Sequence, residues 1–225
     1  MVAVLPQATA EFVRPTRERR RPATKREQRQ ASLARLSESA LELFVAQGYR
    51  QTPVEQIAHA VGLTKGAVFF YFGSKAGLLG HLLDGVEAAV VDGLEENLAA
   101  AGTDARDQLV AFIHSQARLG VEHWREVLLL ILMSLEFAGR GELGDRIGAI
   151  YRRLYDHVEA IIARGRAQGT FRDDCGGREQ AAVVMAGHDG IFLEWHRRKQ
   201  ELQGRELVRA LRRTMQAGLL KEEAR

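Results

Sequence analysis

The placement of proline constrains the fold of this chain more than any other feature. Four prolines occur in 225 residues, three of them before residue 23 and the fourth at Pro53. Proline removes a backbone donor and clashes inside a helix, so a long proline-free stretch leaves helices free to form. Apolar residues recur at three- and four-residue spacing through most of that stretch. We therefore predict an all-α fold.

About nine helices are expected from this periodicity and from the turn residues between the periodic runs. Thr24 and Glu27 can form a capping box that opens the first helix. No apolar run approaches the ~20 residues that cross a bilayer, and the first 20 residues lack the apolar core of a signal peptide, so we expect a cytoplasmic protein without a membrane segment. The expected helices span about 24–48, 52–61, 64–71, 75–98, 104–121, 123–138, 143–168, 178–200 and 203–221.

The segment 52–75 reads as two short helices joined by a glycine turn. Thr52 can cap the first helix and form a capping box with Glu55, and Pro53 suits the first helical position. Gly62 can adopt the left-handed conformation that ends this helix. This order of features is typical of a helix-turn-helix, which places its second helix in the DNA major groove.

The start of the second helix, expected at 64–71, suits contact with DNA. Thr64 and Lys65 lie at its N-terminus, where backbone N–H groups and the helix dipole favour phosphate. Gly66 and Ala67 are small enough to let the backbone approach base edges. Lys75, next to a capping Ser74, can reach a second phosphate.

The segment from about Leu33 to Leu79 resembles the DNA-binding domain of TetR-family transcriptional regulators. The matching features are Gly48-Tyr49, Thr52, Ile57-Ala58, the run from Val61 to Gly66, and the run from Tyr71 to Lys75 that leads into Leu78-Leu79. The resemblance implies an all-helical homodimer, usually a repressor, that a small ligand releases from DNA. It also implies DNA contacts by Thr52, Thr64, Lys65, Gly66, Tyr71 and Lys75, and we add Ala67 and Phe69 as candidates. Phe69 stands where the family commonly has tyrosine, so one phosphate contact lacks its hydroxyl here.

Charge is distributed unevenly along the chain. Residues 1–75 hold 12 Lys and Arg against 6 Asp and Glu, which gives +6, whereas the remainder holds 20 against 23, which gives −3. A basic end and a mildly acidic body suit a protein that faces phosphate at one end. We divide the chain into a disordered basic tail at 1–23, a DNA-binding domain at 24–74 and a helical effector-binding and dimerisation domain at 75–225. The arginines of the tail can either contact DNA or remain solvated.

Helices of the second domain can enclose a pocket for an effector. The inventory is mostly apolar, which favours a hydrophobic or amphipathic small molecule, and acyl-CoA-like and drug-like compounds both fit. Polar residues amid apolar sequence, including His114, are of interest because a buried polar group needs a partner, and a ligand can be that partner. The candidate lining residues are Phe112, Trp124, Leu128, Leu132, Leu135, Glu136, Tyr151, Tyr155, Met185, His188, Asp189 and Phe192.

The last two expected helices each carry an apolar stripe that can form a dimer interface. In the family that the chain resembles, the last two helices pair with their copies as a four-helix bundle, but the same stripes suit packing within one chain. The candidate interface residues are Val184, Ile191, Trp195, Leu207, Leu211 and Met215. A dimer of this kind would read a palindromic DNA operator with two recognition helices about one DNA turn apart.

Other classes of function are less well supported by the sequence. It contains no glycine-rich phosphate loop, serine nucleophile elbow or His-Glu-x-x-His motif, so we expect neither an enzyme nor a bound cofactor. His188 and His196 are two helical turns apart, too far to hold one metal ion. Cys175 is the single cysteine and favours an incidental loop thiol over a redox sensor. The remaining alternative is a helical small-molecule-binding or interaction protein whose DNA-binding motif is degenerate.

Overall fold

A computed structural model describes residues 24–198 and 201–221, so the predicted tail at 1–23 lies outside the described residues. Every regular element in the described part is a helix, and the one β-bridge there pairs Phe171 with Leu220. The all-α prediction is confirmed. In chain order the helices are α1 Lys25–Gln47, α2 Val54–Ala60, α3 Lys65–Phe72, α4 Lys75–Glu87, the π-helical turn η1 Ala88–Asp92, α5 Gly93–Ala100, α6 Ala105–Glu122, α7 Trp124–Phe137, α8 Gly141–Ala167, α9 Gly177–Arg197 and α10 Gly204–Leu219.

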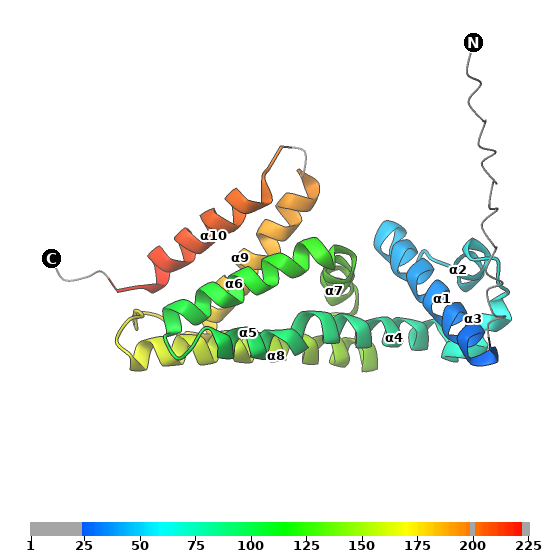
Figure 1. The fold of residues 1–225 in the computed structure, drawn as a ribbon, viewed down its shortest axis with the longest axis horizontal. Helices are drawn as coiled ribbons and strands as arrows, with labels where there is room; N and C mark the ends of the chain where they lie inside the picture. The colour runs from blue at the N-terminus through cyan, green and yellow to red at the C-terminus, as the bar shows by residue number, and fades with distance from the viewer. Residues whose placement is uncertain (1–23, 199–200, 222–225) are drawn as a thin grey trace, which may run out of the picture.

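The molecule is elongated, with α1, α2 and α3 packed together at one end (Figure 1). The predicted capping box opens α1: the Thr24 N–H donates to Glu27 Oε2 at 2.6 Å, and the Glu27 N–H donates to Thr24 Oγ1 at 3.2 Å. Gly48, with φ of 85°, ends α1. Leu36, Ala40 and Phe44 give this helix a fully buried face, against which α2 and α4 pack.

The second predicted capping box is wrong. Pro53, rather than Thr52, occupies the position before α2, and no side chain caps that helix. The Thr52 hydroxyl instead donates to the carbonyl of Gly48 at 2.7 Å, and the residue is fully buried, so the predicted contact of its side chain with DNA is wrong as well. The segment between α1 and α2 is short, so the Thr52 hydroxyl reaches a backbone carbonyl at the end of α1. It is then not available to cap the first N–H groups of α2.

One continuous helical path runs from Lys75 to Ala100 through α4, η1 and α5, where the sequence predicts one helix at 75–98. Leu78, Leu79 and Leu83 bury its first half against the N-terminal helices. The second half buries Val91 and Leu94 against the C-terminal helices. The π-helical turn η1 lies between the two halves and widens the helix locally, a feature that is often found at functional sites.

Helices α6 to α10 form the rest of the molecule, which we call the C-terminal bundle. α8 runs along the length of the bundle and packs against α6, α7 and α9, while α9 and α10 pack side by side (Figure 1). As predicted from its all-round apolar sequence, α7 is central, and Val127 to Ile131 are all buried. At the far end of the bundle the fully buried ring of Phe171 packs so closely on Gly165 that a Cβ there would lie 2.4 Å from the ring.

No helix in the described part of the chain is long and apolar enough to cross a membrane. Among the same residues, no group of three or more His, Cys, Asp or Glu side chains is placed to hold a metal ion. Cys175 is exposed and unpaired with any other cysteine.

Candidate DNA-contacting surface and effector cleft

The turn between α2 and α3 has the geometry of a helix-turn-helix. Gly62 adopts φ of 68°, and the Leu63 N–H folds back to the Ala58 carbonyl at 2.9 Å. Thr64 then precedes α3 in an extended conformation, and its exposed side chain makes no capping hydrogen bond. The Thr64 hydroxyl and the first N–H groups of α3 therefore face solvent at the end of the helix that favours anions.

Lys65 and Phe69 form a small exposed cluster with Glu55 of α2. Lys65 Nζ lies 2.5 Å from Glu55 Oε1 and 5.6 Å from the centre of the Phe69 ring. The hydrogen bond from Lys65 lowers the pKa of the Glu55 carboxyl. Both charged side chains are more than half exposed, so water screens the pair and Lys65 can exchange this partner for a phosphate at little cost.

Gly66 leaves open surface in the first turn of α3. A Cβ at this position would meet only Thr64 Oγ1, at 3.6 Å, so the packing of the chain itself does not require glycine here. Ala67 beside it is half-buried. The absence of a side chain at Gly66 suits the close approach of another molecule, as the sequence predicts.

Phe70 is an exposed aromatic residue of α3 that the sequence analysis missed. Its side chain is 73% exposed, whereas Val68 of the same helix is fully buried. Tyr71 is half-buried with its ring 5.1 Å from that of Phe70. The signal was present: Val68 and Phe72 are four residues apart and face the core, so the intervening Phe69 and Phe70 must turn outward.

Lys75 has an internal role that its sequence position did not reveal. Its Nζ lies 4.3 Å from the centre of the Tyr49 ring and 3.5 Å from the Arg50 carbonyl. Desolvation lowers the pKa of the Lys75 ammonium, and nearby Glu136 opposes this effect. The Tyr49 ring also packs against Phe44 at 5.2 Å and against Phe137 of α7 at 5.3 Å. Lys75 therefore helps to join the N-terminal helices to the bundle, and its contact with phosphate stays a prediction.

Glu136 lies at this junction rather than in a pocket. Its Oε1 is 3.0 Å from Arg50 Nε, and the carboxylate is 19% exposed. The predicted role of Glu136 in lining a pocket is therefore wrong, because the side chain points away from the bundle toward the N-terminal helices. Within the described residues its Oε1 makes an ion pair but no well-aligned hydrogen bond, so the charge has room to change partners.

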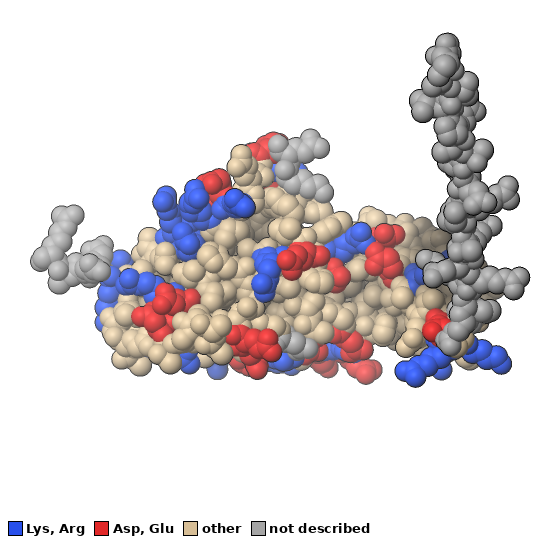
Figure 2. Space-filling model, viewed as in Figure 1, with Lys and Arg blue, Asp and Glu red and all other residues tan. Residues whose placement is uncertain are grey.

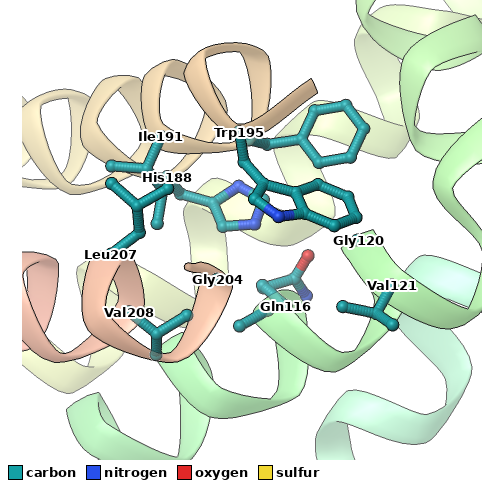
Figure 3. A pocket seen from close by; sticks show the side chains of 11 residues that line it. Gln116, Gly120, Val121, His188, Ile191, Trp195, Gly204, Leu207 and Val208 are labelled. Carbon is teal, nitrogen blue, oxygen red and sulfur yellow. The ribbon is translucent and has the colours of Figure 1, made fainter. Parts of the chain in front are cut away.

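A small cleft opens between α6, α9 and α10 (Figure 3). Of the predicted pocket residues, only His188 and Phe192 line it. Ile191, Trp195 and Leu207, which were predicted to form a dimer interface, line it as well. The sequence analysis missed the wall that α6 contributes and part of α10, namely Gln116, Ala117, Gly120, Val121, Gly204 and Val208.

The other predicted pocket residues lie elsewhere in the bundle. Trp124 stacks on His196 with ring centres 5.4 Å apart. Burial, together with the nearby Asp189 carboxylate, raises the pKa of the Tyr151 hydroxyl. His114 and Leu135 are exposed. The remaining residues are core or packed against it, as expected when apolar sequence alone is used to predict a pocket: Phe112, Leu128, Leu132, Tyr155 and Met185.

The predicted dimer stripe is mostly an intrachain contact. Val184, Leu211 and Met215 are buried within the single chain. At Gly187 of α9 a Cβ would lie 2.5 Å from Met215 Cε, which shows how closely α9 and α10 approach each other. Side chains that are already buried within one chain cannot contact a partner subunit. The prediction that Val184, Leu211 and Met215 form the dimer interface is therefore wrong.

Comparison with known proteins identifies the family. Residues 36–82, which include the whole helix-turn-helix, match the family described as bacterial regulatory proteins, tetR family. The HTH-type transcriptional regulator TcmR of Streptomyces glaucescens is 30% identical over 171 residues, which cover 72% of this chain and 72% of TcmR. The chain belongs to the TetR family. The HTH-type transcriptional repressor KstR2 of Rhodococcus jostii is 24% identical over 168 residues, which cover 72% of this chain and 78% of KstR2.

A solved structure agrees with this assignment. The MbdR regulator from Azoarcus sp. CIB is 46% identical, with a TM-score of 0.76, and the match covers 84% of this chain and all of the MbdR chain. The chain is therefore a DNA-binding transcriptional regulator, and its relatives are regulators rather than enzymes. Proteins of the TetR family bind DNA operators and are dimers. On the face shown in Figure 2, basic side chains gather near the end formed by α1 and α3 and again over α10.

Replacing Gly66 with alanine should separate DNA binding from stability. Alanine favours the helix by up to about 1 kcal/mol and meets no clash, so the free energy of unfolding should stay equal or rise. Affinity for operator DNA should fall about tenfold, because the new methyl group occupies the space closest to the bases. Chemical denaturation and fluorescence anisotropy measure the two quantities. Gly85→Ala, at an open position of α4, is the matched control and should leave DNA affinity unchanged. Equal affinities for the two variants would remove Gly66 from the interface.

Proposed function

We propose that this regulator is a homodimeric repressor that reads a palindromic operator and leaves it when a small molecule binds the C-terminal bundle. The observation that carries the proposal is the outer surface of α3, where Thr64, Lys65, Gly66 and Phe70 are all exposed while Val68 anchors the helix to the core. The Lys65 ammonium can contact phosphate, the missing side chain at Gly66 lets the backbone approach the bases, and the Phe70 ring can contact base edges. Such a repressor would work in the cytoplasm, where it meets its operator.

The proposed dimer interface is the outer face of α9 and α10. Small or apolar residues line this face at helical spacing and are exposed in the single chain, with Val183 61% exposed. Small side chains let helices of two chains approach closely, and the inner faces of α9 and α10 are already occupied. The residues of the proposed interface are Ala182, Val183, Ala186 and Gly190 on α9, and Ala210, Thr214, Ala217 and Gly218 on α10.

The proposed route from effector to DNA is the helical path from Lys75 to Ala100 together with the junction around Tyr49. Ion pairs tie α8 to this path along its length, including Arg146 with Asp84 and Arg153 with Glu87. A shift of the bundle would therefore carry the path with it and change the spacing of the two copies of α3. The size of the effect is limited by how differently the effector binds the two states. The division of the chain at residue 74 stays a proposal, since the first half of this path packs against helices that precede residue 74.

Replacing Lys65 with alanine tests the proposed function directly. Loss of one phosphate contact should weaken binding to every duplex and lower the slope of log K against log salt by about 0.9. Anisotropy titrations at four salt concentrations measure the slope. Arg118→Ala, an exposed cation of α6 away from α3, is the control and should leave it unchanged. An unchanged slope for Lys65→Ala would favour the alternative in which the motif is degenerate and the bundle alone acts as an interaction module.

Replacing Phe70 with alanine should act on specificity instead of on the salt slope. An aromatic ring at this exposed position suits apolar contact with a thymine methyl group. Affinity for the operator should fall about tenfold, while affinity for random DNA and the salt slope stay the same, because no charge is removed. Leu135→Ala is the matched control, since Leu135 is also 73% exposed but lies on α7. A parallel loss of affinity for operator and random DNA would contradict this role.

A further inference from the structure

The cleft between α6, α9 and α10 carries an inference about the chemistry of the effector, which rests on the proposed function. None of its eleven lining residues is Lys, Arg, Asp or Glu. The walls are mainly aliphatic and aromatic, with the Trp195 indole on one side and Val121 near the mouth (Figure 3). A charged ligand group placed here would lose its hydration without gaining an opposite charge. The lining therefore selects against carboxylates and phosphates inside the cleft.

Gln116 supplies one polar group to this apolar cleft. Its side chain is 4% exposed, and its Nε2 donates to the carbonyl of Val90 at 3.3 Å. The amide is thereby oriented with its oxygen toward the cleft, as Figure 3 shows. Within residues 24–198 and 201–221 no group donates to this oxygen. An acceptor without a donor that faces a cleft in this way lowers the free energy of the complex when a ligand covers it and brings a donor.

His188 supplies the second polar group. Its residue surface is 7% exposed, and its Nδ1 lies 3.2 Å from Asp189 Oδ1. A carboxylate only accepts hydrogen bonds, so Nδ1 carries the hydrogen, and in the neutral ring Nε2 is an acceptor. In the part of the chain that the structure describes, Nε2 has no donor either. Two acceptors without donors thus face one apolar space.

We propose that this cleft binds a small, uncharged and largely apolar molecule with a hydroxyl or N–H group whose hydrogen is shared between Gln116 Oε1 and His188 Nε2 as a three-centre bond. A planar ring suits the flat side of Trp195. The apolar body supplies most of the affinity through burial, and the donor supplies selectivity, because an analogue without it leaves both acceptors unpaired.

Gln116 also connects the cleft to the DNA-binding end of the molecule. The carbonyl that it holds belongs to Val90, inside the π-helical turn η1. A ligand donor on Oε1 bonds to the same amide whose Nε2 satisfies that carbonyl. Occupancy of the cleft therefore acts on η1, which is continuous with α4, and α4 packs against α3 of the helix-turn-helix.

Three naphthalenes of similar size test the ligand class by titration calorimetry on the full chain. 2-Naphthol donates a hydrogen bond, 2-methoxynaphthalene cannot, and 2-naphthoate is an anion. We expect 2-naphthol to bind about tenfold tighter than the ether, the difference typical of an acceptor that a bound ligand covers without supplying a donor. The anion should bind more weakly than both. Equal binding of alcohol and ether, or tighter binding of 2-naphthoate, would overturn the proposal, the latter because it would mean that Nε2 carries a proton.

Two variants test the assigned acceptors. His188→Asn keeps a donor near Nδ1 for Asp189 but removes Nε2, and Gln116→Met removes the amide while keeping its length. Each should reduce the preference for 2-naphthol over the ether to about twofold or less. Gln108→Met is the matched control, since Gln108 is a buried glutamine of the same helix outside the cleft, and it should keep the preference. Thermal melting identifies any variant that fails to fold, and an undiminished preference in both folded variants would overturn the assignment.

Anisotropy with operator DNA, run without and with 2-naphthol, separates this inference from the proposed function. A protein that binds the alcohol selectively but never binds a specific duplex supports the ligand site and contradicts the repressor. A protein that binds its operator but none of the three naphthalenes keeps the repressor and overturns the ligand class. Release of DNA by 2-naphthol, lost in Gln116→Met, supports both.

Discussion

The continuous helical path from Lys75 to Ala100 is the constraint on which the rest of the structure depends. Its first half buries leucines against the three N-terminal helices, and its second half buries valines and leucines against the C-terminal bundle. Neither part of the molecule can move far without bending this path or breaking its contacts. The π-helical turn at Ala88–Asp92 is the one irregular segment between its two halves, so it is the natural place for such a bend.

Around this path the structure divides its polar groups by function. Charges that connect the two ends, such as those of Arg50 and Glu136, are partly exposed and add little to stability, but they can exchange partners. Buried polar groups that keep the fold, such as the Thr52 hydroxyl, are satisfied by backbone carbonyls. Gln116 and His188 differ from both, since each satisfies one partner with one end and turns the other end toward an open cleft.

Much of the fold could be predicted from the sequence because the signals are local. Proline placement, glycine turns and apolar periodicity gave the nine helical segments, and the Thr24 capping box was right. The Thr52 box failed because the same residue could serve either of two neighbouring helix ends, and only the packed chain decides between them. The contact of Lys75 with the Tyr49 ring could not be predicted, because it depends on how α4 packs against the end of α1.

The effector cleft was harder to predict for a related reason. Periodicity shows that a helix has an apolar face but does not say whether a neighbouring chain, the same chain or a ligand covers it. Val184 of α9 and Leu211 of α10 are buried within the single chain, where α9 and α10 pack together. Ile191 and Trp195, on the same apolar stripe of α9, instead line the cleft. The α6 wall was not predicted because Gly120 and Ala117 have little or no side chain. Such small residues leave space for a cleft but add nothing to the apolar periodicity of the sequence.

Selection of random duplex DNA on the purified protein at moderate salt, read out by sequencing, tests the central claim most directly. The account predicts one enriched palindrome whose half-sites are about 10 base pairs apart, or a multiple of that, as two copies of α3 on one face of the DNA require. Enrichment should be weaker in Phe70→Ala, by about the tenfold loss of operator affinity, while bulk binding persists. Bulk, salt-sensitive binding without any enriched sequence would contradict the account, because α3 would then contact phosphate without reading bases.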